Sequence, residues 1–351
     1  MHSKKPVSQT ISSLTSLINV SKKLVQYREF VLLVITRRIS LKDKFVKELG
    51  YEKTIERKLH VRSFTVKQTF VTLTVSDILK YSKGLDLLKE VETLLCDYLE
   101  IDNVELFLTR DKEIPKNIET LIQMNIDTLK EGYPLAYIRG KVNFYGLEFI
   151  VNKNVLIPRR DTEIIVNEAI GCIKKLNKLV RMLELGVGSG CISISIANEF
   201  SLPDQLSILG IEKSEEALQV ANENVKKHKL ENIIELSEGD LLDGIDDEFD
   251  ILVANLPYVD LNAQLGSGVR EHEPHMALFA DDGGLALYRQ VLEQIADKGM
   301  KFKYILFEIG FDQGEGAIEL CKSLACEYEV SVVKDLEGRD RVVFLSSCKI
   351  S

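Results

Sequence analysis

The feature that most constrains the fold of this chain is a glycine-rich turn between two apolar runs, in the stretch VRMLELGVGSGCISISIANEF from residue 180 to residue 200. The apolar run before the turn predicts a buried strand of a parallel sheet, and the run after it predicts a helix. Gly186, Gly188 and Gly190 allow a sharp turn and let a ligand approach without a Cβ in the way. The pattern predicts an α/β fold with a ligand at the carboxyl end of this strand, and a tight turn without a ligand is the simpler alternative.

A carboxylate at the end of the next predicted strand points to a nucleoside cofactor. The strand LSILGIE ends in Glu212, 26 positions after Gly186, where a carboxylate can accept hydrogen bonds from both hydroxyls of a ribose. The dinucleotide pattern would need a glycine where Cys191 stands. Glu184 precedes the turn, and an acid there is unfavourable beside a pyrophosphate but compatible with a sulfonium that carries an amino-acid tail. These features favour S-adenosylmethionine over NAD, with these candidate contacts: Glu184, Gly186, Val187, Gly188, Ser189, Gly190 and Glu212.

The chain then continues to alternate strands and helices, as a doubly wound sheet requires. The strand IIELS is followed by Asp240 and Leu241, at the sheet edge where open α/β folds bind their ligands. Asp240 can accept a hydrogen bond from an adenine amino group, and Leu241 can pack on the adenine ring. We therefore include both residues in the predicted cofactor site, with a turn cap as the alternative for Asp240.

The next predicted strand, FDILVAN, delivers the tetrapeptide Asn-Leu-Pro-Tyr to the same edge. Methyl transfer from a sulfonium mainly requires an oriented nucleophile, and a planar nitrogen is a poor one because its lone pair is delocalised. The Asn255 side-chain oxygen and the Leu256 backbone oxygen can accept the two N–H groups of a flat amide, which favours the growing positive charge. Pro257 restricts Leu256 to extended geometry, which aims that carbonyl outward, and Tyr258 can stack on the amide. The tetrapeptide predicts an acceptor clamp for a flat NH₂ group, with an ordinary β-turn as the alternative.

The charge of the chain is unevenly divided. Residues 1–72 contain 15 Lys and Arg against 5 Asp and Glu, whereas the rest contains 30 against 49. Because nucleic-acid affinity depends on cations that neutralise phosphates, the acidic body argues against a nucleic-acid partner. The six cysteines form no CxxC pair, and the two histidines of EHEPH do not share a helix face, so we expect no metal. No apolar run reaches about 18 residues, so we expect no membrane span.

The length of 351 residues suggests two domains, at roughly 100–200 residues each. We expect residues 1–72 to be a basic, poorly ordered extension, either a tail before a start site further downstream or an organelle transit peptide. Helical periodicity predicts a small helical domain over residues 73–139. Alternating apolar residues predict a β-hairpin linker over residues 140–160, which leaves residues 161–351 for the α/β domain.

Taken together, these motifs resemble those of the HemK/PrmC family of protein-(glutamine-N5) methyltransferases over roughly residues 74–351. The resemblance rests on the following segments, in the order that the family has them: PLAYIRG, FYGLEF, LIPRRDTE, LELGVGSGCISI, NLPYV, VREHEPHMALFADDGGLALYR, EIGFDQGE and DLEGRDRVV. Each segment is modest alone, but the set is highly specific.

The resemblance implies a class I S-adenosylmethionine-dependent methyltransferase domain with a doubly wound, seven-stranded, mostly parallel sheet, and a helical N-terminal domain. We expect this helical domain to recognise the substrate, with a role as a scaffold as the alternative. The implied substrate is the glutamine amide of the Gly-Gly-Gln motif in class I peptide chain release factors. By the family's pattern, the glycine turn holds the methionine portion of the cofactor and Glu212 holds the ribose. Asn255 would touch both cofactor and substrate, and Leu256, Pro257 and Tyr258 would complete the clamp.

The chain departs from the family's pattern where Leu256 and Arg160 replace prolines and where Leu241 replaces a common aromatic residue. Three alternative functions remain open: an adenine N6-methyltransferase acting on RNA or DNA, a dinucleotide oxidoreductase, and a non-catalytic cofactor-binding scaffold. We expect a monomer in a bacterial-type cytoplasm, or in the mitochondrial matrix if residues 1–72 are a transit peptide.

Overall fold

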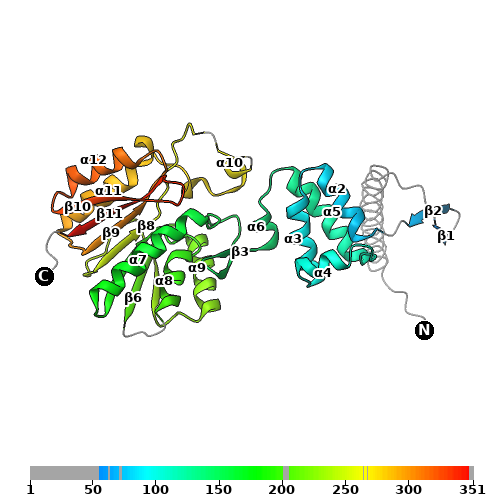
Figure 1. Cartoon of the computed structure of the whole chain (residues 1–351), viewed down its shortest axis with the longest axis horizontal. Helices are drawn as coiled ribbons and strands as arrows, with labels where there is room; N and C mark the ends of the chain where they lie inside the picture. The colour runs from blue at the N-terminus through cyan, green and yellow to red at the C-terminus, as the bar shows by residue number, and fades with distance from the viewer. Residues whose placement is uncertain are drawn as a thin grey trace, which may run out of the picture. The chain divides into compact units, whose positions relative to one another are not determined.

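The computed structural model describes residues 55–61, 64–70, 73–200, 205–263, 265–266 and 268–347 (Figure 1). Most of the expected tail or transit peptide, residues 1–54, lies outside the described residues. Two strands that the sequence analysis did not predict, β1 (Ile55–Val61) and β2 (Phe64–Phe70), pair as an antiparallel hairpin. The chain divides into two compact units, residues 1–126 and residues 127–351.

The first unit is largely helical in its described part. Its helices are α2 (Val75–Gly84), α3 (Leu88–Leu99), α4 (Asn103–Leu108) and most of α5 (Lys116–Lys130). A capping box starts α2, because Thr74 Oγ1 accepts the N–H of Asp77 at 3.3 Å and the Asp77 carboxylate accepts the N–H of Thr74 at 3.0 Å. Apolar residues at helical spacing, such as Ile78, Leu95 and Ile122, bury one face of each helix. The predicted helical N-terminal region is therefore confirmed.

A short hairpin lies early in the second unit. It follows the helix α6 (Leu135–Arg139) and consists of β3 (Lys141–Phe144) and β4 (Leu147–Ile150). Tyr145 and Gly146 form its turn with φ angles of 51° and 76°, as a two-residue hairpin turn requires. Asn224 fastens its end, accepting the N–H of Ile150 at 2.7 Å and donating to the carbonyl oxygens of Ile150 and Ser189, both at 2.9 Å. Asn224 thereby links the hairpin to the glycine turn.

A seven-stranded sheet forms the body of the second unit, in the order β10-β11-β9-β8-β5-β6-β7. Its strands are β5 (Val180–Leu185), β6 (Leu206–Glu212), β7 (Ile234–Glu238), β8 (Ile251–Ala254), β9 (Tyr304–Glu308), β10 (Tyr328–Lys334) and β11 (Asp340–Ser347). Neighbours from β7 to β9 run parallel, and β11 runs antiparallel to both β9 and β10. The predicted doubly wound, mostly parallel sheet is confirmed. Its strand order reverses between β5 and β8, which is where open α/β sheets bind ligands.

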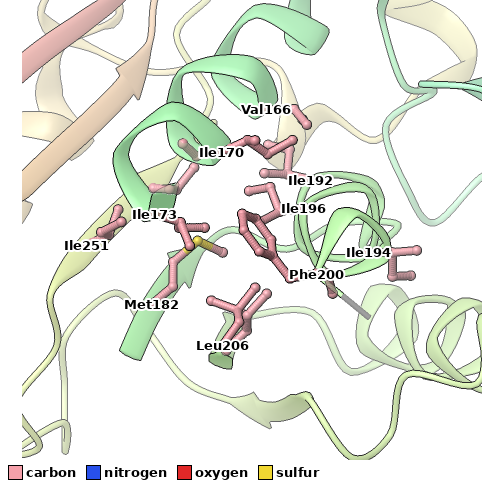
Figure 2. Close-up of a cluster of buried hydrophobic side chains, with 14 of the residues drawn as sticks. Val166, Ile170, Ile173, Met182, Ile192, Ile194, Ile196, Phe200, Leu206 and Ile251 are labelled. Atoms are coloured by element: carbon pink, nitrogen blue, oxygen red, sulfur yellow. The ribbon is translucent and has the colours of Figure 1, made fainter. Parts of the chain in front are cut away.

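Helices cover both faces of this sheet. One face is covered by α7 (Glu163–Leu176), α8 (Cys191–Glu199) and α9 (Glu215–His228), and the other by α11 (Ala286–Lys298) and α12 (Gly314–Leu324). Successive residues of β5 point to opposite faces, so Met182 belongs to the first core whereas Leu183 and Leu185 belong to the second. Figure 2 shows the first core, where Ile170 of α7 and Ile192 of α8 gather with Met182.

Four short helical elements occupy the loops of the second unit: η1 (Arg160–Thr162), α10 (Val269–His272), η2 (His275–Ala277) and η3 (Asp282–Gly284). No helix within the described residues is long and apolar enough to cross a membrane. Among the same residues, the side chains that commonly bind metals do not come together in groups of three or more.

Candidate active site

A cavity of about 470 Å³ opens at the carboxyl ends of β5, β6 and β8, within the second unit. Its lining includes most of the predicted site residues: Gly186, Val187, Gly188, Ser189, Glu212, Asp240, Leu241, Asn255, Leu256 and Pro257. The other predicted site residues are all described by the structure and lie outside this lining: Glu184, Gly190 and Tyr258. The grouping follows from the topology, because the carboxyl ends of neighbouring parallel strands meet at one edge of the sheet.

The glycine turn between β5 and α8 has a backbone conformation that favours glycine. Gly186, Gly188 and Gly190 have φ angles of 72°, 57° and 80°. A Cβ on Gly186 would lie only 2.9 Å from Cδ2 of Leu256, so glycine allows the turn to approach the clamp segment closely. Gly190 lies at the start of α8, where a Cβ would meet Ile194 at 3.1 Å. Gly190 therefore serves helix packing, while Gly186 and Gly188 border the cavity.

Glu212, the last residue of β6, is held by two backbone N–H groups. One carboxylate oxygen accepts the N–H of Gly188 at 2.8 Å, and the other accepts the N–H of Ser214 at 2.9 Å. A carboxylate offers roughly four lone-pair positions, so both oxygens can still accept hydrogen bonds from a ligand. This geometry fastens Glu212 to the glycine turn and suits an acceptor for the hydroxyls of a ribose.

Asp240 and Leu241 follow β7 and line another part of the cavity. Asp240 lies 2.6 Å from Nζ of Lys213, a pairing that the sequence analysis missed. Both charged side chains are substantially exposed, so solvent screens this pair. Leu241 is buried and has a φ of 53°, which is unusual for a residue with a Cβ. Leu241 lines the cavity in this conformation, where a flat ring could pack against it.

Glu184 lies inside the protein instead of at the cavity. Its side chain lies on the same face of β5 as Met182, and α8 covers that face. Its carboxylate accepts hydrogen bonds from the N–H of Ser193 at 3.0 Å and from the Ser193 hydroxyl. Burial raises the pKa of Glu184 to about 8, and one of its oxygens has no hydrogen-bond partner among the described residues. Glu184 thus holds the first turn of α8, and any effect on a ligand would pass through the glycine turn.

The side chain of Asn255 begins a chain of hydrogen bonds that runs into the protein. Asn255 Nδ2 lies 3.4 Å from Thr162 Oγ1, which in turn lies 3.1 Å from Glu308 Oε1. The Tyr258 hydroxyl donates to the same Glu308 oxygen at 3.2 Å. Both polar side chains of the Asn-Leu-Pro-Tyr segment are therefore connected to Glu308, to which the sequence analysis assigned no role.

Glu308 ends β9, the strand next to β8, and its side chain is buried. Burial raises the pKa of Glu308 to about 7. The sequence did contain a signal for this residue, because Glu308 closes the apolar strand YILFE just as Glu212 closes LSILGIE. Thr162, in the segment LIPRRDTE, carried no comparable signal.

The backbone of Leu256 contacts a buried tyrosine of α11. The N–H of Leu256 donates to the Tyr288 hydroxyl oxygen at 3.2 Å, and the Leu256 carbonyl oxygen lies 3.4 Å from the same atom. The Tyr288 hydroxyl donates more closely to the carbonyl oxygen of Glu308. A carbonyl oxygen has two lone pairs, so a substrate contact with Leu256 would use the one that does not face Tyr288.

Residues 153–159 and the segment from Pro274 to Phe279 contribute a further wall of the cavity. The buried carboxylate of Glu273 joins these two segments, because it accepts from the Arg159 guanidinium and from the N–H of Ile157 at 3.2 Å. The sequence analysis considered the two histidines of this region but predicted no contact for Glu273. Glu273 is buried but the Arg159 side chain is 40% exposed, so solvent partly screens this ion pair, and its main effect is to hold the two segments together.

Two family models match the chain. The model described as a methyltransferase domain matches residues 176–297, and the model described as the PrmC N-terminal domain matches residues 86–140. The release factor glutamine methyltransferase of Francisella tularensis is 31% identical over 254 residues, which cover 72% of this chain and 88% of that protein. The protein of the same name from Streptococcus pneumoniae is 33% identical over 261 residues, which cover 73% of this chain and 91% of that protein.

Solved structures give weaker likenesses. The N-terminal domain of human METTL16 in complex with SAH has a TM-score of 0.43 at 13% identity and covers 57% of this chain and 76% of that chain. Precorrin-6y C5,15-methyltransferase from Geobacter metallireducens has a TM-score of 0.38 at 17% identity and covers 57% of this chain and 94% of that chain. Likenesses at this level carry no argument about ligand or substrate, so the curated relatives are the informative comparison.

Proposed function

Since the chain belongs to the family of release factor glutamine methyltransferases, we propose that it transfers a methyl group from S-adenosylmethionine to a glutamine side-chain amide nitrogen in class I peptide chain release factors. The target glutamine is that of the Gly-Gly-Gln motif. The observation that carries the proposal is the likeness to the curated relatives, at 31% to 33% identity over nearly three quarters of the chain. The position of Asn255, Leu256 and Pro257 at the cavity supports it.

The residues around the cavity fit S-adenosylmethionine. Its volume of about 470 Å³ suits a small-molecule site. The absence of a Cβ at Gly186 lets the glycine turn pack closely against Leu256, and the methionine portion would lie along this turn. The carboxylate of Glu212 keeps lone pairs for the ribose hydroxyls, and Asp240 and Leu241 would hold the adenine. When bound, this cofactor supplies a methyl group that its sulfonium has already activated.

The chain's own contribution to the reaction is to orient the glutamine amide. The side-chain oxygen of Asn255 and the backbone oxygen of Leu256 accept its two N–H groups, while Pro257 keeps Leu256 extended. Two fixed acceptors hold the nitrogen in position and stabilise the positive charge that develops on it. Tyr258 would stack on the amide, with its ring held in place by the hydrogen bond from its hydroxyl to Glu308.

Transfer of label from the cofactor tests this function. Purified protein is incubated with S-adenosylmethionine labelled in the methyl group and with either a class I release factor or total RNA. We expect the release factor to take up label, and replacement of its Gly-Gly-Gln glutamine by glutamate to abolish uptake. Labelling of RNA alone would reject the proposal in favour of adenine methylation, and tight binding of NADH without S-adenosylmethionine would reject the cofactor.

We also propose that the enzyme acts as a monomer in a bacterial-type cytoplasm, without a nucleic-acid partner. The bacterial relatives and the acidic composition of residues 73–351 support this setting. Residues 73–139 would recognise the substrate. Residues 140–160 would link them to the catalytic domain, which residues 161–351 would form, and residues 1–72 would be an extension. Sedimentation of the purified protein tests the monomer. Mass spectrometry of the native amino terminus tests the mitochondrial alternative, in which a transit peptide would have been removed.

A further inference from the structure

We propose that Thr162 and Glu308 form a positioning relay that makes the oxygen of the Asn255 amide, and not its NH₂ group, face the substrate. The proposal deepens the proposed function and rests on it, because the relay acts on the amide that would grip the glutamine. Thr162 ends η1, Asn255 directly follows β8, and Glu308 ends β9. Thr162 is 93 positions from Asn255 and 146 positions from Glu308 in the chain.

The number of available protons sets the direction of the relay. Glu308 Oε1 lies within hydrogen-bond distance of the Thr162 and Tyr258 hydroxyls, at 3.1 Å and 3.2 Å. An ionised carboxylate can only accept, so both hydroxyls must donate to it. Thr162 has a single hydroxyl proton, and once that proton is donated to Glu308 its oxygen can only accept. The Asn255 atom 3.4 Å from Thr162 Oγ1 must therefore be the donor Nδ2.

This direction matters because the two ends of an asparagine amide have nearly the same size and opposite hydrogen-bonding character. With Nδ2 turned to Thr162, Asn255 Oδ1 is the end left for a ligand. A glutamine amide can donate to that oxygen, whereas a glutamate carboxylate would place lone pairs against it. If Asn255 turned over, its NH₂ group would meet the N–H groups of the glutamine and would favour the carboxylate instead. The relay therefore makes the site select an amide over an acid.

The charge on Glu308 is what enforces the direction. Its side chain is 2% exposed, and its second oxygen has no partner among the described residues. The ionisable groups that face it come from several elements: Asp161, Cys191, Tyr258, Tyr288 and Arg341. Burial raises the pKa of Cys191 and of both tyrosines, so these groups stay neutral near pH 7. Asp161 and Arg341 pair with each other at 2.8 Å.

Protonation of Glu308 would weaken the relay. Burial raises the pKa of Glu308 to about 7, so its charge is lost as the pH falls below neutrality. The added proton finds an acceptor only on Oε1, because Oε2 has no partner among the described residues. Oε1 then donates to a hydroxyl, and Thr162 is free to turn its own proton towards Asn255. Activity should therefore fall on the acidic side of this pKa in the wild-type enzyme.

The first test compares substitutions of Thr162 in the full-length enzyme, with a release factor as substrate. Thr162→Val removes the hydroxyl at similar volume, and we expect kcat to fall about 10- to 100-fold, as when one partner of a buried hydrogen bond is lost. The KM for the release factor and the affinity for S-adenosylmethionine should change little. Thr162→Ser should recover most of the lost kcat. Ser195→Ala is the matched control, because it removes a buried hydroxyl that has no hydrogen-bond partner among the described residues.

A second readout separates positioning from mere support of the fold. A release factor with Gly-Gly-Glu in place of Gly-Gly-Gln is used as a competitive inhibitor of methyl transfer. We expect Thr162→Val to strengthen this inhibition relative to the KM of the normal substrate, because the Asn255 amide can then turn its NH₂ group to the carboxylate. Ser195→Ala should leave that ratio unchanged. An unchanged ratio in Thr162→Val, together with wild-type kcat, overturns the relay.

The third test uses Glu308→Gln, which keeps an acceptor oxygen but cannot ionise. Wild-type kcat/KM should decline as the pH falls below about 7, and Glu308→Gln should lose this decline. A decline that persists in Glu308→Gln contradicts the relay, even if the Thr162 variants fail to fold. Wild-type enzyme that methylates no release factor at any pH would refute the proposed function itself, which distinguishes the two failures.

Discussion

Replacing the buried Glu184 with glutamine should make the stability of this protein less dependent on pH. Burial raises the pKa of Glu184 from an ordinary value of 4.5 to about 8 in the folded protein. The folded state therefore holds the proton more tightly than the unfolded state does. The stability that this proton contributes is fully present below about pH 4.5 and is lost as the pH rises through about 8. Glutamine cannot titrate, so Glu184→Gln removes this loss.

The pKa difference sets the size of the effect. Within that window, each pH unit costs the wild type about 1.4 kcal/mol of unfolding free energy through this one group. From pH 5.5 to pH 7.5, the free energy of unfolding of Glu184→Gln relative to that of the wild type should therefore increase by about 3 kcal/mol.

Urea unfolding followed by circular dichroism at both pH values measures this difference. Glu308 titrates in both the wild type and Glu184→Gln, so its contribution to the free energy of unfolding cancels when the two are compared. Glu235→Gln, on an exposed position of β7, controls for the removal of a negative charge. An equal free-energy difference between Glu184→Gln and wild type at pH 5.5 and pH 7.5 would show that Glu184 does not bind its proton more tightly in the folded state.

Three further predictions concern the cavity. Gly186→Ala should weaken S-adenosylmethionine binding at least tenfold by calorimetry, because its Cβ would lie 2.9 Å from Leu256 and its φ is positive; unchanged affinity would contradict the close approach. Glu212→Ala should weaken the same binding by roughly 10- to 100-fold, as expected for the loss of hydrogen bonds to a charged group, whereas binding equal to wild type would remove Glu212 from the ribose site. Asn255→Ala should abolish methyl transfer to a release factor while leaving the melting temperature near wild type, and full activity would eliminate the clamp.

The arrangement of the sheet could be predicted because its signals are local in the chain. The apolar run before the glycine turn gave β5, and similar short runs ending in Glu212 and Asn255 gave β6 and β8. The parallel arrangement then brought the residues after these strands to one edge, which is why most predicted site residues line one cavity. The position of these residues followed from where each strand ends, a property that a sequence pattern records well.

The contacts between side chains from distant segments could not be predicted in this way. The Thr162–Glu308 hydrogen bond joins residues 146 positions apart, and no local pattern indicates which acid meets which hydroxyl. The expectation for Glu184 shows a different limit. Its nearness to the turn was recognised, but the alternation of side chains along β5 turns it under α8 towards Ser193. The alternation of side chains along β5 assigns each residue to one face of the sheet. If this assignment comes before that of ligand contacts, it places Glu184 inside the protein.

The way Asn224 meets the hairpin has a consequence for aggregation. A two-stranded ribbon leaves outward-facing backbone groups on which another chain can add a strand. At Ile150 the carboxamide of Asn224 forms hydrogen bonds with both the backbone N–H and the backbone carbonyl oxygen, as a residue of a third strand would. A side chain of α9 thus closes part of an open β-edge where the fold supplies no further strand. Asn224→Leu would leave both backbone groups of Ile150 without this partner, and we expect more self-association than in the wild type when the two purified proteins are compared by light scattering.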